Sequence, residues 1–102
     1  MIRFIIHYGI HFIVPLFIAY LFYRKKFLWA SLILLSAMLI DLDHLFANPI
    51  YDPNRCSINF HLLHTYPFII MYTLLIISKK TRLFGIALLL HILADTVDCL
   101  FI

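Results

Sequence analysis

Residues 27–46 read FLWASLILLSAMLIDLDHLF, an apolar run of twenty residues that closes on two aspartates and a histidine. A helix rises about 1.5 Å per residue, so about 20 apolar residues cross the roughly 30 Å hydrocarbon core of a bilayer. This run therefore predicts a membrane-spanning helix that carries a polar cluster at one of its ends.

The composition of the whole chain agrees with this interpretation. Of its 102 residues, 65% are apolar and only 13% are charged, and the mean hydropathy is +1.02. A soluble domain is about half apolar and a quarter charged, so the composition indicates a protein embedded in a lipid bilayer. The net charge of +3 rests on eight scattered Lys and Arg residues. These are too few for a nucleic-acid groove, and we expect no nucleic-acid partner.

Three further apolar runs of similar length accompany the first. The segments are 4–23, 27–46, 59–78 and 83–102, joined by short basic connections at 24–26 and 79–82 and by a longer polar loop at 47–58. Short connections make consecutive helices antiparallel. The sequence therefore predicts an all-α fold, in which residues 1–102 form one integral membrane antiparallel four-helix bundle. It does not fix the oligomeric state, and a homo-oligomer is compatible with it.

The distribution of basic residues predicts the orientation of the bundle. Each short connection carries three Lys or Arg residues, whereas Arg3 and Arg55 are the remaining two. Cytoplasmic loops carry the excess of Lys and Arg. We therefore expect both termini and the longer loop to face outward, although basic residues also anchor helix ends at lipid headgroups.

Ten ionisable side chains lie inside the four segments, and they include every histidine and four of the five acids. Such a residue costs at least about 2.5 kcal/mol at the centre of a membrane helix, so it is usually functional. All ten fall in the outward-facing halves of their segments and so form one layer. They are His7, His11, Asp41, Asp43, His44, His61, His64, His91, Asp95 and Asp98.

The spacing of these residues places several of them on shared helix faces. Residues three or four apart lie on one face, as His7 and His11 do. Asp41 and Asp43 lie about 200° apart on an α-helix, so either the helix is irregular there or one aspartate supports a ligand without binding the ion. Pro15 removes the backbone hydrogen bond to the His11 carbonyl, which predicts a kink that opens room for a site.

Imidazole and carboxylate groups without thiolates are the ligands of zinc, manganese and non-haem iron. One tetrahedral zinc uses three or four protein ligands, so ten donors predict two or three ions, with zinc preferred and manganese or iron as alternatives. A multinuclear site binds an oxyanion and activates water, which favours hydrolysis of a phosphoester such as a phospholipid headgroup. Asp98 or Asp43 is then the expected base, and Arg55 the cation that holds the phosphate.

Other uses of these donors lead to different functions. The chain contains no Glu, unlike ferritin-like di-iron bundles, and a haem held by two histidines would leave the aspartates without a cation. A proton or ion relay stays open, although the inner halves of the segments lack ionisable residues to continue a pathway. A metal-binding protein without catalytic activity is also compatible, because the sequence does not reveal an open coordination position.

The two cysteines, Cys56 and Cys99, both lie on the predicted outer side. In an oxidising exterior they can form a disulfide between the longer loop and the last helix, and otherwise they are free thiols.

Motifs at these residues resemble a known group of proteins. Residues 41–44 read DLDH at the end of an apolar segment, and residues 91–95 contain the pattern HxxxD. With an early histidine, these motifs resemble the LexA-regulated membrane-bound metal-dependent hydrolases. The segment NRCSINFHLLH at 54–64 looks closer to a small bacterial membrane family related to that group.

This resemblance implies a location in the bacterial cytoplasmic membrane and metal motifs similar to those of zinc-dependent phospholipase C. It implies zinc ligands at the DLDH and HxxxD motifs, at His61 and His64, and at an N-terminal histidine. The larger hydrolases carry His-Arg and Thr-His-Ser where this chain has HLLHT at 61–65, so the resemblance does not imply their substrate.

Overall fold

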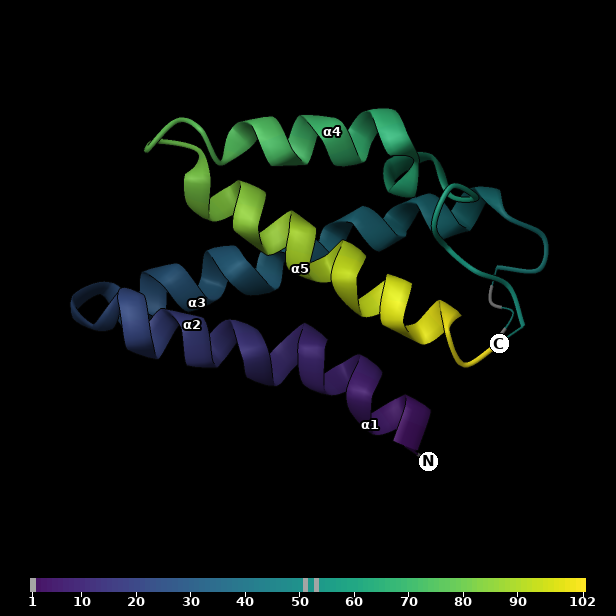
Figure 1. The fold of residues 1–102 in the computed structure, drawn as a ribbon, viewed down its shortest axis with the longest axis horizontal. Coiled ribbons are helices and arrows are strands. Elements are labelled where there is room, and N and C mark those ends of the chain that lie inside the picture. Colours follow the sequence, from purple (N-terminus) through teal and green to yellow (C-terminus); the bar gives the residue numbers. More distant parts are fainter. Residues whose placement is uncertain (1, 51, 53) are drawn as a thin grey trace.

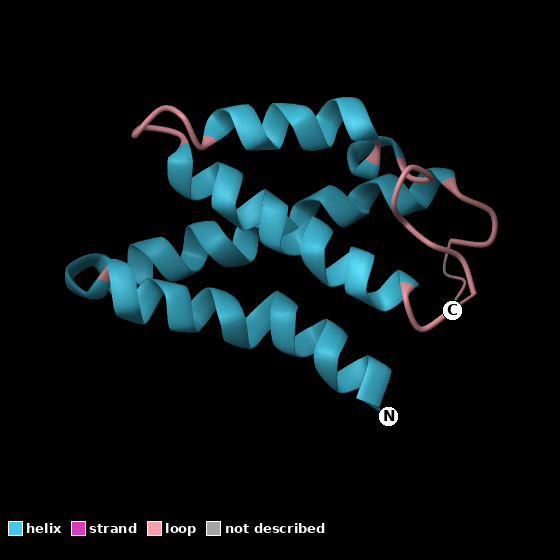
Figure 2. Cartoon of the chain, viewed as in Figure 1, coloured by secondary structure: helices cyan, strands magenta, loops and turns pink. Residues whose placement is uncertain are grey.

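The computed structural model describes residues 2–50, 52 and 54–102, so that residues 1, 51 and 53 lie outside the described part, the last two within the predicted loop. The described residues form helices and loops and contain no strand, which confirms the all-α prediction (Figure 2). The elements are α1 Ile2–Tyr8, the π-helical turn η1 Gly9–Ile13, α2 Val14–Phe22, η2 Arg24–Lys26, α3 Phe27–Ser36, the 3₁₀ segment η3 Ala37–Phe46, η4 Leu62–His64, α4 Tyr66–Leu75 and α5 Arg82–Cys99.

The chain runs along the molecule and back, and α5 lies in its centre (Figure 1). Helix α5 packs against α1, α3 and α4 and also against η1 and η3. Both basic connections lie at one end of the molecule, whereas the two termini and the loop between η3 and η4 lie at the other. The elements that carry the histidines and aspartates therefore converge around the second half of α5.

Small side chains allow the helices to approach closely in the half of the molecule away from these donors. The buried cluster there consists of Ala19, Ala30, Leu34, Ala37, Leu83 and Ala87. A Cβ atom at Gly85 would lie 2.8 Å from the carbonyl oxygen of Tyr72, so only glycine fits where α4 crosses α5. Close approach through Gly and Ala is the usual packing of helices in a membrane, where lipid removes the hydrophobic drive for association.

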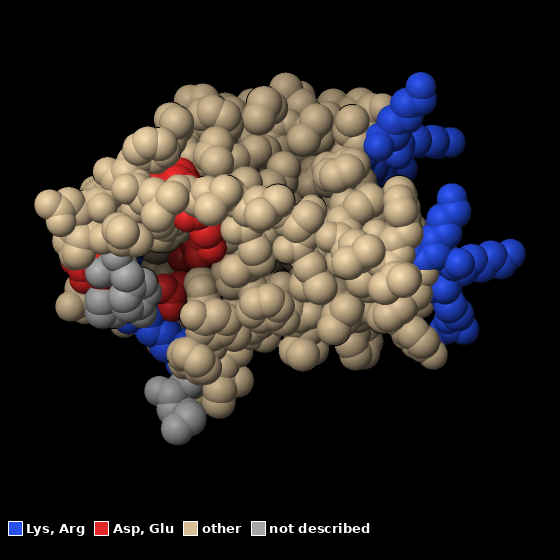
Figure 3. Space-filling view, turned by 180° about the vertical axis from the view of Figure 1, so that it is seen from behind, with Lys and Arg blue, Asp and Glu red and all other residues tan. Residues whose placement is uncertain are grey.

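On the face of the molecule in Figure 3, the Lys and Arg side chains gather mainly at one end and the Asp side chains lie towards the other, with uncharged residues between them. Large apolar side chains that are more than half exposed include Phe4, Phe17, Phe22, Leu28, Leu32, Leu39, Ile70 and Leu74. Two helical runs, Ile2–Phe22 and Arg24–Phe46, are long and apolar enough to cross a membrane by length and composition. These runs allow a membrane location, whereas α4 has only ten residues and α5 carries Arg82, Asp95 and Asp98.

The predicted helix over 59–78 is wrong in its first turns, because α4 begins only at Tyr66. Pro67 lies in the first turn of α4, where its missing N–H needs no partner, and this position favours a helix start. Upstream of it, His61 and Thr65 adopt extended backbone conformations on either side of η4. The remaining predicted segments agree with the structure within a few residues, and the last helix ends at Cys99.

Candidate metal centre

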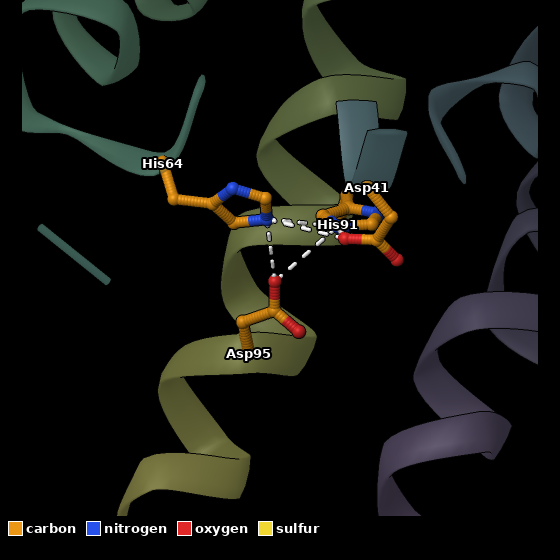
Figure 4. Close-up of side chains that lie close together, drawn as sticks. All are labelled: Asp41, His64, His91 and Asp95. Atoms are coloured by element: carbon orange, nitrogen blue, oxygen red, sulfur yellow. Dashed lines mark hydrogen bonds and ion pairs between the residues drawn. The ribbon is translucent and has the colours of Figure 1, made fainter. Parts of the chain in front are cut away.

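The structure brings nine of the predicted donors into three groups, each of which can hold a metal ion. The first group contains Asp41, His64, His91 and Asp95 (Figure 4). His91 and Asp95 come from one face of α5, Asp41 from η3 and His64 from η4. Only Asp41 is partly open to solvent, since His64, His91 and Asp95 are buried.

The four ligand atoms of this first group lie close to one another. His64 Nε2 lies 2.9 Å from Asp95 Oδ2, 3.2 Å from His91 Nε2 and 3.4 Å from Asp41 Oδ1. His91 Nε2 lies 2.9 Å from Asp41 Oδ1 and 3.2 Å from Asp95 Oδ2. Bonds of about 2.0–2.1 Å from zinc to nitrogen and oxygen give tetrahedral edges of about 3.3–3.4 Å. One of the five separations matches such an edge and the other four are shorter by up to about 0.5 Å, so the four atoms converge on one point where an ion could be held.

The second group contains His7, His11 and Asp95. The other oxygen of Asp95, Oδ1, lies 3.7 Å from His11 Nε2 and 4.0 Å from His7 Nδ1. These two imidazole nitrogens are buried and have no hydrogen-bond partner among the described residues. Asp95 thus turns one oxygen to each of two groups, as a carboxylate does when it bridges two ions.

The position of His11 follows from the helix irregularity that Pro15 predicts. Residues Gly9–Ile13 form a π-helical turn directly before α2, which has Pro15 in its first turn. The wider turn compensates for the hydrogen bond that proline cannot make, and such turns often occur at functional sites. His11 is buried in this turn and packs edge-on against His91, with 4.5 Å between the ring centroids.

The third group contains Asp43, His44 and His61. Asp43 Oδ1 lies 3.1 Å from His44 Nδ1, and the rings of His44 and His61 stack with 3.7 Å between their centroids. His61 lies in the loop before η4, where burial lowers the pKa of its imidazole and the neighbouring His44 adds to the effect. A lower pKa favours the neutral imidazole, which is the form that binds a metal.

Asp41 and Asp43 lie on η3, which has 3₁₀ geometry instead of the regular α-helix that would turn them about 200° apart. The His64 ring lies between the two carboxylates. Asp43 Oδ2 lies 2.9 Å from Nδ1 of His64, whose Nε2 faces Asp41. The same oxygen accepts a hydrogen bond of 2.8 Å from the backbone N–H of Leu63. Carboxylates that hold the second nitrogen of a metal-binding histidine fix its orientation, and Asp43 does so for His64.

Local backbone features position His61 and His64 outside a regular helix. Asn59 adopts a left-handed conformation with φ of 61°, which asparagine tolerates better than most residues, and its N–H bonds the His64 carbonyl at 3.0 Å. The Tyr72 hydroxyl on α4 donates a hydrogen bond of 2.7 Å to the carbonyl of Leu63. These contacts hold η4 against α4.

Asp98 lies outside the three groups and forms an ion pair with Arg3. The Arg3 Nε and Nη2 atoms lie 2.7 and 3.0 Å from the two carboxylate oxygens of Asp98. The sequence interpretation did not assign a function to Arg3. Arg3 precedes His7 by four residues and so lies on the same helix face, and this spacing was the sequence signal for its position near the donors.

A cavity of about 200 Å³ opens onto the donors from the outer loop. Its lining contains five residues of the donor groups, His7, Asp41, His44, His61 and Asp95, together with Arg3, Tyr8, Asp52, Arg55, Ser57 and Asp98. The guanidinium of Arg55 donates to the Ile50 carbonyl at 3.0 Å and lies 4.7 Å from the centre of the Phe60 ring. Two cations and three donor groups therefore face one polar cavity.

Cys56 and Cys99 form a disulfide that joins the outer loop to the end of α5 across 43 residues. The bond fixes the neighbouring residues Arg55 and Ser57 near Asp98, at the rim of the cavity. The alternative of free thiols does not occur in this structure.

The fold and the site together define an all-α protein whose buried histidines and aspartates form three groups able to hold metal ions. The chain belongs to a family of unknown function, DUF6122, which it matches over residues 1–102. No curated protein and no solved structure matches the chain.

Proposed function

We propose that this protein is a membrane-embedded, metal-dependent hydrolase that cleaves a phosphoester at the outer face of the membrane, with zinc as its metal. The observation that carries the proposal is the convergence of Asp41, His64, His91 and Asp95 on one point beside a polar cavity. Hydrogen bonding leaves buried donor atoms unsatisfied, because Asp95 Oδ2, His11 Nε2 and His7 Nδ1 have no hydrogen-bond partner among the described residues.

The membrane location and the orientation are supported by three properties of the chain. Exposed apolar side chains cover the body of the molecule, and the basic connections lie at the end opposite to the donors (Figure 3). Cytoplasmic ends of membrane proteins carry the excess of Lys and Arg. The disulfide lies at the donor end, and disulfides persist in oxidising compartments outside the cytoplasm.

The phosphoester substrate is supported by the two arginines of the cavity. Guanidinium groups bind phosphate oxygens through several N–H donors, and Asp98 holds the Nε and Nη2 atoms of Arg3 in place at the rim. Arg55 is anchored by the Ile50 carbonyl and the Phe60 ring. A phosphate group in the cavity would meet the positive charge of Arg55, with Arg3 and its partner Asp98 also in the lining.

Metal ions held by the three groups would polarise the phosphoester and lower the pKa of water towards 7. Asp95, with one oxygen in each of two groups, would hold two ions side by side, and Asp43 would keep His64 in its binding orientation. Water then forms a bond to phosphorus as the ester P–O bond breaks. Asp98, with one of its oxygens released from Arg3, would accept the proton of the attacking water and pass it to the departing alcohol.

The test begins with the metal content of the detergent-purified protein, measured by plasma mass spectrometry before and after chelation. We expect two or three zinc ions per chain, and release of phosphate from p-nitrophenyl phosphate or phosphatidic acid that is lost on chelation and restored by zinc. Asp98→Asn keeps the metal and lowers turnover by at least about a hundredfold, since general bases contribute about 10²–10⁴-fold.

Two outcomes would replace this proposal with another function. Bound metal without hydrolysis of any phosphoester would identify a metal-binding protein that is not an enzyme. A folded protein that binds no metal would leave the histidines and aspartates as a proton or ion relay, which transport assays in vesicles would then detect.

A further inference from the structure

A second, apolar groove of about 540 Å³ lies beside the third donor group. Phe46, Phe60 and Leu62 line its walls, and Asp43 and His61 lie at its polar side. These three apolar side chains are more than half exposed, and Phe46 is 89% exposed. The groove is thus an open apolar surface that leads directly to residues of the candidate metal centre.

The groove and the polar cavity share His61, which lines both. Phe60 connects them a second time, since one of its neighbours is the Arg55 guanidinium in the polar cavity. A molecule that occupies both would place its apolar part against Phe46 and Leu62 and its anionic part between Arg3 and Arg55. The third donor group, Asp43, His44 and His61, would lie where the two parts join.

The apolar surface continues from the groove along the outside of η3. Leu42 and Leu45 lie on η3 just before Phe46, and both are more than 60% exposed. In the proposed membrane this surface faces lipid, so a hydrocarbon chain reaches the groove without crossing water. Exposure of hydrocarbon to water is unfavourable, and a chain that passes from lipid into the groove stays in contact with apolar groups throughout.

We propose that the groove formed by Phe46, Phe60 and Leu62 binds the hydrocarbon chain of a lipid phosphate whose headgroup enters the polar cavity. This inference rests on the proposed function and names its substrate class, a phosphoester attached to a lipid. The chemistry of the two pockets supports this occupant, because the groove offers aromatic and aliphatic surface to the chain. The cavity offers Arg55 and the donor groups, whose metal ions would offset the carboxylates of the lining and attract the phosphate.

Binding is tested without reference to activity, by photo-crosslinking of the zinc-loaded protein in nanodiscs. The probe is phosphatidic acid with a diazirine in its acyl chain, and labelled residues are identified by mass spectrometry. Soluble dihexanoyl phosphatidic acid is expected to reduce labelling of the groove residues at least tenfold, while labelling of the exposed Leu32 on α3 stays constant. Equal labelling of both sites with and without the competitor would overturn the inference.

Hydrolysis provides the second arm, with dihexanoyl phosphatidic acid compared with glycerol 3-phosphate, which lacks the chains. We expect Phe46→Ala and Leu62→Ala to lower kcat/KM about tenfold for the lipid and to leave it unchanged for glycerol 3-phosphate, with metal content intact. Leu32→Ala is the matched control and changes neither value. Equal effects on both esters would overturn the groove assignment.

The two arms separate failure of this inference from failure of the proposed function. Competed labelling of the groove without hydrolysis of either ester supports the lipid site and contradicts the hydrolase. Hydrolysis of both esters at equal rates, without competed labelling, supports the hydrolase and contradicts the lipid site.

Discussion

Replacement of Asp95 by asparagine tests the metal centre most sharply, because this carboxylate belongs to two donor groups. Its Oδ2 lies 2.9 and 3.2 Å from His64 and His91, and its Oδ1 lies 3.7 Å from His11. Asparagine keeps the shape but removes the charge and one acceptor. We therefore expect Asp95→Asn to weaken the first two groups together and to leave the third intact.

The size of the effect follows from the number of ligands in the first group. Structural zinc sites bind with about 10–16 kcal/mol, so one of four ligands accounts for roughly 3–4 kcal/mol, or about 10²–10³-fold in affinity. At a free zinc concentration 100 times the dissociation constant, each site stabilises the fold by about 2.7 kcal/mol, and the variant loses nearly that amount at each of its two weakened groups, or about 5 kcal/mol in total. The melting temperature in zinc should fall accordingly.

The assay counts zinc per chain after equilibration against buffered zinc and records thermal unfolding of the same samples. With one ion in each of the three groups, we expect Asp95→Asn to retain one ion and His61→Ala to retain two. Asp52→Asn is the control, because Asp52 lies outside the groups and accepts a hydrogen bond from the N–H of Asn54. Wild-type zinc content in Asp95→Asn would refute the assignment of Asp95 as a ligand.

Three further predictions test the packing, the orientation and the cavity. Gly85→Ala should destabilise the protein by about 1–3 kcal/mol, because the added Cβ would lie 2.8 Å from a backbone oxygen. Gly9→Ala is the control and should not destabilise the protein, because no atom lies within 4 Å of its added Cβ. Chemical denaturation measures both variants. In intact cells Cys56 and Cys99 should resist maleimide until a reductant is added, and labelling without reduction would argue against an outward-facing donor end. Arg55→Gln should raise KM for a phosphoester at least tenfold with unchanged zinc content, and an unchanged KM would remove Arg55 from substrate binding.

The parts of the structure that the sequence predicts are those set by composition and spacing along single helices. The apolar run 27–46 is helical from end to end, and His91 and Asp95, four residues apart, do face one group. The other predicted ligands also lie in one of the three donor groups. A layer of buried histidines and aspartates is stable only when these side chains pair with one another or with a cation.

Features that depend on contacts between different helices and loops could not be predicted from the sequence. The prediction missed the start of α4 at Tyr66 because it used apolar content alone. Pro67, which favours a position in the first turn of a helix, marks that start. The opposed roles of Asp41 and Asp43 required the 3₁₀ geometry of η3 and the position of His64 between them. The pairing of Arg3 with Asp98 joins residues 95 positions apart, and no local pattern encodes it.

The π-helical turn at Gly9–Ile13 makes the residue count of the first helix as important as its residue types. The five-residue reach of a π turn takes up one residue more than an α turn, and each residue turns an α-helix by about 100°. Removal of a single residue here would restore a regular α turn and leave Arg3 and His7 on the same helix face, but it would remove the wide turn that carries His11. A relative with one residue fewer in this turn would therefore keep the face of α1 towards α5 and lose the placement of His11 against His91.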